Sequence, residues 1–508
     1  MSLLTDITDS IGPLTAFVLI FLGWYVISAV YSWYRLCHVP GPFLASFSYL
    51  WLAWYALSGK QLEIIDDVGK KYGSLIRLGP NVLLVDDPEV IKSLSSAKSK
   101  YKKSTWYTGS RFNPYHPTMF ITLDPIAHDK IKAQVWPGYS GRDNPNYESD
   151  IDFQVGNFID IIRKRYITTP EAGGFRPLDL ARTVSYFTID VISKLSTGQE
   201  FGFLETESDR HGFIAATHKQ ILLISIAQDV PLVRDIAYST LGLKIWGPKE
   251  TDSTGFGRIM HIANEAIRKR FKPDADKQEK TVLASFIRHG LTQPQCEVES
   301  LFMFVAGSDT TASAIRATLL HILSIPRVYQ RMKDEITLAV NEGRVSSPIT
   351  QAEAKELPYL QAVIYEGLRI RPVTTAMVAK EVPRGGDTIN GKFIPEGMII
   401  GSNFQSLLHS KALFGEDAEM FRPERYMELD PKARTEMERN VELTFGYGRW
   451  MCAGKPIAFM ELNKIYFELL RNFDFQLLNP QNPMTTASYG LYLDKGLIVR
   501  VTESDIAH

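Results

Sequence analysis

The sequence predicts a mostly α-helical fold with small separate β-sheets (α+β), preceded by one N-terminal transmembrane helix. Three observations support this prediction: helical periodicity dominates, strand-like patches are confined to three places, and a long apolar stretch lies near the N-terminus. Strands and helices do not alternate, which disfavours a parallel βαβ sheet. Residues 39–508 contain no repeat, low-complexity run or flexible linker, so we expect residues 1–38 to form an anchor and residues 39–508 a single domain.

Composition excludes several classes of protein. The 508-residue chain has a formal net charge of −1, which gives no indication of a nucleic-acid partner. Its three cysteines, Cys37, Cys296 and Cys452, lie far apart. An odd number at such spacing fits neither a disulfide framework nor a CxxC zinc site, and it indicates a reducing compartment.

The first predicted element is a membrane-spanning helix from Ile11 to Tyr34, a stretch without a charged side chain. At about 1.5 Å per residue it is long enough to cross a hydrocarbon core of about 30 Å. A cleavable signal peptide is the alternative, but Asp6 and Asp9 occupy the place where such a peptide carries basic residues. Arg35 and His38 follow the stretch, which favours a cytoplasmic location for the rest of the chain.

The next elements follow from local patterns. A helix is predicted from Gln61 to Gly73, where apolar residues recur at helical spacing and a glycine ends the pattern. Ser74 to Pro88 is typical of a β-hairpin that turns at residues 79–81. Two further strand-rich patches are predicted, one from Met377 to Ile400 and one within Phe473 to Val501.

The longest predicted helix runs from Cys296 to Pro326. About thirty residues make a rod of about 45 Å, which would cross the whole domain. Its middle is almost entirely apolar, which indicates a buried helix, yet a glycine and an unpaired carboxylate are costly there. Either the helix is exposed at that point, or a local kink presents a carboxylate and a hydroxyl to a buried site. The residues concerned are Gly307, Asp309, Thr310 and Thr311.

A second helix, between Pro358 and Pro372, carries Glu366 and Arg369. Such a pair is common on exposed helices and contributes only a few tenths of a kcal/mol there. Here Glu366 can lie on the apolar side of the helix, and a buried Glu–Arg pair requires further donors. Arg425, in the later segment FRPERY, is the candidate donor.

The chemically most informative segment is FGYGRWMCAGKP, Phe445 to Pro456, in which Cys452 lies between Gly448 and Gly454. A free buried cysteine is usually a small hydrophobe. In a glycine-rich loop with basic neighbours it is also a candidate nucleophile, zinc ligand or haem ligand. A nucleophile requires a basic partner, and no His–Asn partner motif is evident.

Taken in order, these segments resemble the cytochrome P450 family of haem-thiolate monooxygenases, and the resemblance covers nearly everything after about residue 39. No single match is specific, but all four occur in the order and at spacings similar to those of the family. The matching residues are AGSDTT at 306–311, EGLR at 366–369, PER at 423–425, and Phe445, Gly448, Cys452 and Gly454 in the cysteine loop.

The resemblance is strongest to fungal, membrane-anchored enzymes of secondary-metabolite biosynthesis of the pisatin-demethylase-like kind, on the segments EVPRGG, INGKFIPEG and FRPERY. It implies that Cys452 is the axial thiolate ligand of the iron of haem b, a ligand that favours O–O cleavage. Gly448 and Gly454 would shape the loop, and Phe445 would pack beside the thiolate. Asp309 and Thr310 would supply protons for oxygen activation. Glu366, Arg369 and Arg425 would be structural.

One position departs from the family pattern. Trp450 stands two residues before Cys452, where the family usually has an arginine or histidine that pairs with a haem propionate. Either Arg449 takes over this contact or other residues hold the propionate, because an indole N–H can donate one hydrogen bond but carries no charge. The resemblance offers three further candidates, His128, Lys132 and Lys380, for which solvated surface positions are the alternative.

The segment after Cys452 is too short for a flavin or NADPH domain. The resemblance therefore implies that NADPH is used indirectly, through a separate cytochrome P450 reductase at the endoplasmic reticulum membrane, with cytochrome b5 as a second candidate donor. The expected pocket segments are apolar, which favours a lipophilic terpenoid, alkaloid or polyketide substrate, and Arg111 could meet a carboxylate on it. Two alternatives stay open: an oxygen-independent haem-thiolate isomerase or dehydratase, and a non-catalytic haem-binding protein.

Overall fold

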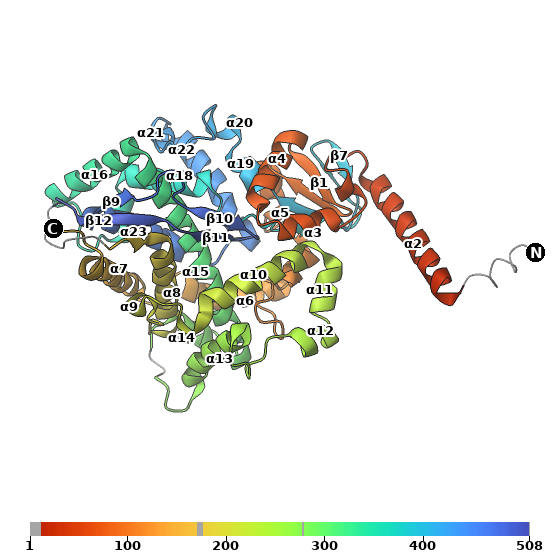
Figure 1. Ribbon diagram of the computed structural model, residues 1–508, viewed down its shortest axis with the longest axis horizontal. Coiled ribbons are helices and arrows are strands. Elements are labelled where there is room, and N and C mark those ends of the chain that lie inside the picture. Colours follow the sequence, from red (N-terminus) through yellow and green to blue (C-terminus); the bar gives the residue numbers. More distant parts are fainter. Residues whose placement is uncertain (1–11, 170–175, 277–278, 507–508) are drawn as a thin grey trace, which may run out of the picture.

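The computed structural model describes residues 12–169, 176–276 and 279–506, and these residues form a mostly helical body with small β-sheets. Figure 1 shows the sheet that contains β1 toward the end from which helix α2 projects, and β9 and β12 toward the opposite end. The predicted α+β class is confirmed.

The helices have the following bounds: α2 Pro13–Leu36, α3 Leu50–Leu57, α4 Gln61–Tyr72, α5 Pro88–Ser95, α6 Pro125–Tyr139, α7 Tyr147–Arg165, α8 Leu180–Thr197, α9 Phe203–Thr206, α10 Phe213–Asp229, α11 Pro231–Ala237, α12 Thr240–Trp246, α13 Gly255–Arg268, α14 Val282–Arg288, α15 Gln293–Ser324, α16 Pro326–Asn341, α17 Gln351–Lys355, α18 Pro358–Ile370, α19 Phe404–Leu408, α20 Lys411–Phe414, α21 Glu424–Met427, α22 Pro431–Glu442 and α23 Lys455–Asn472. Short 3-10 turns lie at η2 Thr105–Gly109, η6 Leu443–Phe445 and η7 Gly448–Trp450.

The strands are β1 Leu75–Gly79, β2 Val82–Val85, β3 Lys102–Lys103, β4 Leu178–Asp179, β5 Lys380–Glu381, β6 Asp387–Ile389, β7 Lys392–Ile394, β8 Ile399–Ser402, β9 Phe473–Leu477, β10 Thr485–Ser488, β11 Tyr492–Lys495 and β12 Ile498–Glu503. The largest sheet has the order β1-β2-β8-β5-β3, with β2 and β8 parallel. The others are β4-β12-β9, β10-β11 and β6-β7.

Most predicted elements are confirmed. The expected hairpin is the antiparallel pair β1–β2, and the two later strand-rich patches contain β5 to β8 and β9 to β12. Helices α4 and α18 occupy the predicted segments. These elements share a strong local signal, because each has a clear apolar period and ends at glycine or proline.

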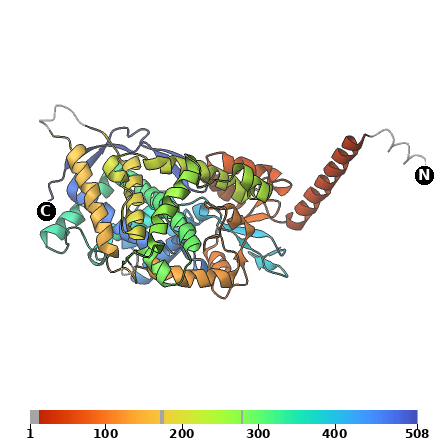
Figure 2. The same ribbon diagram turned by 90° about the horizontal axis from the view of Figure 1, so that it is seen from below.

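Helix α2 projects from the body in both views (Figures 1 and 2), and its apolar side chains are largely exposed. Its length and composition suffice to cross a membrane. The predicted start at Ile11 lies outside the described residues. The last turn is attached to the body by the buried Arg77, which donates hydrogen bonds to the carbonyl oxygens of Trp33 at 3.2 Å and Ser32 at 2.9 Å. Because carbonyl groups in a last turn have no partner within the helix, Arg77 fixes the point where α2 joins the domain.

Helix α15 forms the centre of the domain and packs against α8, α13, α18 and α23. It is helical through Gly307, Asp309 and Thr310, so the local kink, one of the two alternatives given above, is not seen as a break in the helix. Gly307 has a packing reason instead: a Cβ atom there would lie 2.9 Å from Cγ1 of Ile192 on α8. The glycine therefore allows two buried helices to approach closely.

Candidate functional site

The cysteine loop connects η6 to α23 and is closed by a hydrogen bond of 2.7 Å from the backbone N–H of Cys452 to the carbonyl oxygen of Phe445. Gly448 has a φ of +56°, and a Cβ atom there would lie 2.7 Å from the carbonyl oxygen of Ser95. Both facts require glycine at this position. Gly454 differs, because a Cβ atom would meet only the sulfur of Cys452, at an ordinary 3.8 Å.

The Cys452 side chain is accessible, yet the surrounding protein desolvates the thiol and thereby raises its pKa. A thiol with both properties borders an internal space. The backbone N–H groups of Gly454 and Lys455 donate hydrogen bonds to the sulfur, and they and the ammonium group of Lys132 lower its pKa. These groups and the ammonium group of Lys455 offset part of the desolvation, so the pKa of the thiol is raised less than burial alone would raise it.

The described residues offer no alternative metal site for this thiol, because they contain no group of three or more His, Cys, Asp and Glu side chains suited to hold a metal ion. A zinc site of protein ligands alone is therefore not formed there. Of the other two cysteines, Cys296 is buried at the start of α15, and Cys37 follows α2.

A cluster of buried basic side chains adjoins the cysteine loop. The register of β3 and β5 places Lys103 directly opposite Lys380, and both side chains are buried. Their Nζ atoms lie 5.0 Å and 5.4 Å from the ring centroid of Trp450. The His128 ring packs on the same indole with centroids 4.5 Å apart. Like charges on opposed strand positions are unfavourable, so an anion beside the two ammonium groups would stabilise this arrangement.

Few groups of the protein itself compensate the charges of Lys103 and Lys380. Lys103 donates to the carbonyl oxygens of Met119 at 3.2 Å and Phe120 at 2.7 Å, and Lys380 donates to the Tyr107 hydroxyl at 3.3 Å. Burial lowers the pKa of Lys380 to about 7, and burial together with the neighbouring lysines lowers the pKa of Lys103 well below its usual value. Neither lysine forms an ion pair with a described carboxylate within 4.0 Å.

The remaining propionate candidates are placed differently. Lys132, from α6, donates to the carbonyl oxygens of Arg449 at 2.7 Å and Met451 at 3.1 Å, and so supports the backbone of the cysteine loop. Arg449 forms an ion pair of 3.0 Å with Asp129. Burial, followed by the charge of Lys103, lowers the pKa of His128 to about 4, so its ring is neutral at pH 7. The indole N–H of Trp450 is buried and has no hydrogen-bond partner among the described residues.

The predicted acid–alcohol pair lies in the middle of α15. The Thr310 hydroxyl donates to the carbonyl oxygen of Ala306 at 2.8 Å, and Asp309 is buried. About two turns before Asp309, Phe302 stacks on Phe120 with centroids 5.1 Å apart, and Phe120 adjoins Lys103. This face of α15 is therefore connected to the basic cluster through aromatic contacts.

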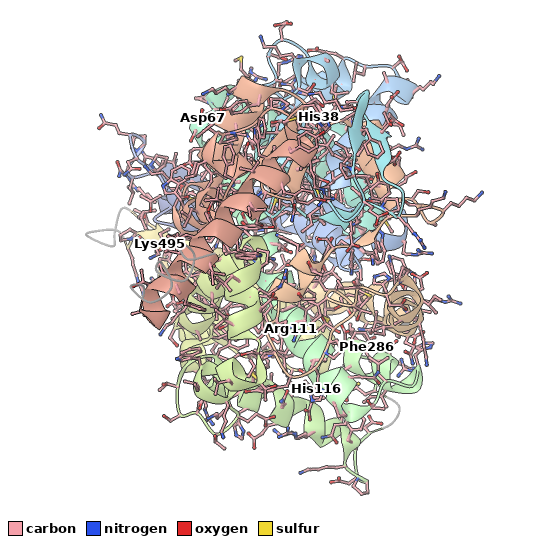
Figure 3. The ribbon with its side chains drawn as sticks, turned by 90° about the vertical axis from the view of Figure 1, so that its right-hand side faces the viewer. His38, Asp67, Arg111, His116, Phe286 and Lys495 are labelled. Carbon is pink, nitrogen blue, oxygen red and sulfur yellow. The ribbon has the colours of Figure 1, made fainter. Side chains whose placement is uncertain are left out.

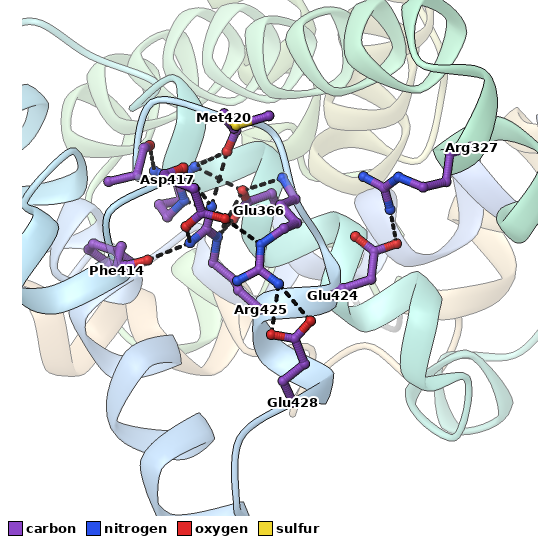
Figure 4. Close-up of polar contacts among 11 residues, drawn as sticks. Arg327, Glu366, Phe414, Asp417, Met420, Glu424, Arg425 and Glu428 are labelled. Atoms are coloured by element: carbon purple, nitrogen blue, oxygen red, sulfur yellow. Dashed lines mark hydrogen bonds and ion pairs between the residues drawn. The ribbon is translucent and has the colours of Figure 1, made fainter.

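The three predicted structural residues form one buried network (Figure 4). Arg369 donates to both carboxylate oxygens of Glu366, at 2.7 Å and 2.8 Å, and Arg425 Nε lies 3.1 Å from each of them. Their remaining donors reach backbone carbonyl groups and the carboxylate of Asp417, so the buried charges are well satisfied. The network joins α18 to α21 and to the segment before α21.

The sequence model of the Cytochrome P450 family matches residues 40–497. The chain belongs to the cytochrome P450 family. It is a haem-thiolate monooxygenase of the kind that receives electrons from NADPH through a reductase. The resemblance inferred from the motifs is thereby confirmed.

Similar curated proteins include fungal P450 enzymes. The chain is 52% identical to cytochrome P450 monooxygenase aba1 of Botryotinia fuckeliana, over 92% of each chain. It is 44% identical to cytochrome P450 monooxygenase ABA1 of Pyricularia oryzae, over 99% of each chain. It is also 30% identical to pisatin demethylase of Fusarium vanettenii, over 90% of this chain and 88% of the relative.

The basic cluster of this P450 fits a haem. Two buried lysines and an indole N–H lack anionic partners, and a haem brings two carboxylates together with an iron ion that a thiolate can bind. Sequence reasoning missed Lys103, because the run YKKS is typical of an exposed segment. Only the pairing of β3 with β5 shows that Lys102 is exposed while Lys103 is buried beside Lys380.

Proposed function

We propose that this P450 oxidises a lipophilic small molecule in fungal secondary metabolism and that the Cys452 sulfur would bind the iron of its haem. The observation that carries the ligand assignment is the accessible sulfur of Cys452, which accepts hydrogen bonds from two backbone N–H groups. When bound, the haem supplies oxygen activation with electrons from the reductase.

We assign roles around the haem to several residues of this chain. Lys103 and Lys380 would hold the propionates together with the indole N–H of Trp450, because these three groups have unmet capacity for an anion. Lys132 would act indirectly, since it already supports the loop backbone. Water is kept from the sulfur side by Phe445, whose ring packs on Phe459 with centroids 5.5 Å apart.

Proton delivery is assigned to Asp309 and Thr310. The Thr310 hydroxyl lies on α15 and is hydrogen-bonded to Ala306, and it would release that bond to donate toward the reaction site. Asp309 is the adjacent carboxyl group and would pass the proton to it. Retention of this pair favours oxygen-dependent chemistry over an isomerase or dehydratase.

An aromatic wall supports the lipophilic substrate. Phe112 and Phe120 lie on the loop before α6, and both pack on Phe302 of α15. Beside them, the Arg111 guanidinium lies 5.4 Å from the Tyr238 ring centroid, and its buried Nε has no hydrogen-bond partner among the described residues. A substrate carboxylate would supply that partner. The relatives include an enzyme named pisatin demethylase, and oxidation of a lipophilic small molecule beside these aromatic side chains is compatible with that relationship.

The substrate assignment is tested by comparing metabolites of a deletion strain with those of strains complemented by the wild-type gene or by Cys452→Ser. We expect a lipophilic precursor to accumulate unless the wild-type gene is restored. The purified enzyme with reductase should then convert this precursor only with NADPH and oxygen. Conversion without either of them would contradict the proposal and favour an isomerase.

For localisation, we propose an endoplasmic reticulum anchor with the domain in the cytoplasm, together with a membrane-bound reductase and cytochrome b5 as partners. Figure 3 looks onto the end from which α2 projects, the end where Figure 1 also places α11 and α12. These two helices expose the apolar side chains Leu232, Ile236, Leu241, Ile245 and Trp246. The full chain should resist carbonate extraction, and a chain without residues 1–38 should remain partly bound; recovery of the full chain in the soluble fraction would contradict the assignment.

A further inference from the structure

The Asp309 carboxylate has a partner on a different helix. Nε2 of His218, on α10, lies 3.6 Å from Oδ1 of Asp309 on α15. The Asp309 side chain is 8% exposed, whereas the His218 side chain is 26% exposed. The histidine is therefore the more solvent-accessible member of the pair.

The other charged group near Asp309 is committed elsewhere. Arg316, two turns further along α15, interacts electrostatically with Asp309, but its guanidinium donates to Asp494 at 3.1 Å and to the Ser185 hydroxyl at 2.7 Å. Among the described residues, His218 is the basic side chain within ion-pair distance of Asp309.

We propose that His218 supplies protons from solvent to Asp309, an inference that rests on the proposed role of the Asp309–Thr310 pair. The imidazolium N–H would transfer its proton to the Asp309 carboxylate, and the neutral imidazole would then take a new proton from water. Imidazole suits this step because histidine exchanges protons readily near neutral pH, whereas the Asp309 carboxylate is largely shielded from bulk water. At 3.6 Å the atoms are just beyond hydrogen-bond distance, and catalytic contacts commonly shorten during turnover.

The competing explanation is that His218 only holds α10 against α15 as an ion pair. His218→Gln separates the two explanations, because an amide can still donate a hydrogen bond to the carboxylate but cannot carry a proton. His218→Phe removes both capacities. A matched control is His261→Gln on α13, since His261 also pairs with an acid, Glu265 at 3.8 Å, and its side chain is 32% exposed.

The experiment uses the full-length haem-loaded protein with reductase and follows NADPH and oxygen consumption without added organic substrate. We expect His218→Gln and His218→Phe to slow turnover at least tenfold and to increase the solvent isotope effect. Asp309→Asn should do the same, and the double variant His218→Gln/Asp309→Asn should be no slower than Asp309→Asn alone. The control His261→Gln should resemble the wild type.

A second measurement is independent of turnover. Thermal unfolding midpoints of the wild type, His218→Phe, Asp309→Asn and the double variant form a cycle, and we expect the shifts to be non-additive. Additive shifts would show that the pair does not form in solution and would overturn the proposal. A wild-type rate and isotope effect in His218→Gln would overturn it as well. If instead Asp309→Asn itself turns over like the wild type, the proposed role of the Asp309–Thr310 pair fails, a result distinct from either.

Discussion

Arg369 donates two hydrogen bonds to Glu366, from Nε to Oε2 at 2.7 Å and from Nη2 to Oε1 at 2.8 Å, with both side chains fully buried. Arg425 adds a second guanidinium to the same carboxylate. A buried charge is tolerated only when it is paired and hydrogen-bonded, so the network is stable as a unit and costly when incomplete.

Glu366→Gln should therefore destabilise the domain by about 3–5 kcal/mol, because two buried guanidinium groups lose their shared carboxylate. Denaturant unfolding of the haem-loaded protein measures this loss. The control is Lys70→Gln, which breaks the exposed ion pair with Asp66 (2.7 Å) and should cost less than about 1 kcal/mol. Equal effects of the two variants would show that the buried network is not structural.

The surroundings of Trp450 and Arg449 lead us to expect different effects on haem retention when each side chain is replaced. Arg449 is already paired with Asp129, whereas the Trp450 N–H has no partner among the described residues. Trp450→Phe should thus accelerate haem loss to apomyoglobin more than Arg449→Ala does. Lys103→Met should accelerate haem loss more than either of these variants, because it removes a charged donor. Charge-assisted hydrogen bonds are roughly twice as strong as neutral ones. Faster loss from Arg449→Ala would assign the propionate to the arginine.

Thr310→Ala should fold and bind haem normally, because the methyl group fits the same space and only the bond to Ala306 is lost. Proton delivery should suffer, so more NADPH should be consumed per product and peroxide should be released. Thr310→Ser, which keeps the hydroxyl, should retain most of the coupling. Peroxide yields that are the same in Thr310→Ala and the wild type would remove this hydroxyl from the mechanism.

The buried carboxyl group of Glu461, in α23, leads us to expect that the stability of the domain depends on pH. It is buried, one carboxyl oxygen has no hydrogen-bond partner among the described residues, and burial raises its pKa well above 4.5. The folded state therefore retains a proton that the unfolded state loses above pH 4.5, so this group lowers stability as pH rises through and beyond that value. At higher pH, the free energy of unfolding of Glu461→Gln should exceed that of the wild type by about 1.4 kcal/mol for every unit of the pKa shift. Below pH 4.5 the two proteins should not differ. A difference that does not change with pH in denaturant unfolding would contradict the protonated state.

The sequence was sufficient to predict the elements with local signals and the family motifs, but not the cation cluster. Helix α4 and the β1–β2 hairpin have their periodicity and stop residues within a few positions, so tertiary structure was not needed to find them. The burial of Lys103 depends on a strand that begins at Lys380, far along the chain, and the contact between His218 and Asp309 depends on how α10 crosses α15. The sequence left an exposed point and a local kink as alternatives for Gly307, because its packing partner Ile192 could not be identified from the sequence.

The central claim is that Cys452 ligates the haem iron, and the carbon monoxide difference spectrum of the reduced protein tests it most directly. The wild type should show the strongly red-shifted Soret band that a thiolate opposite carbon monoxide produces, and so should Cys37→Ser and Cys296→Ser. Cys452→Ser should lack this band, because a hydroxyl is a far poorer donor to iron at neutral pH. A Cys452→Ser protein that keeps the red-shifted band would contradict the assignment of this loop as the haem site.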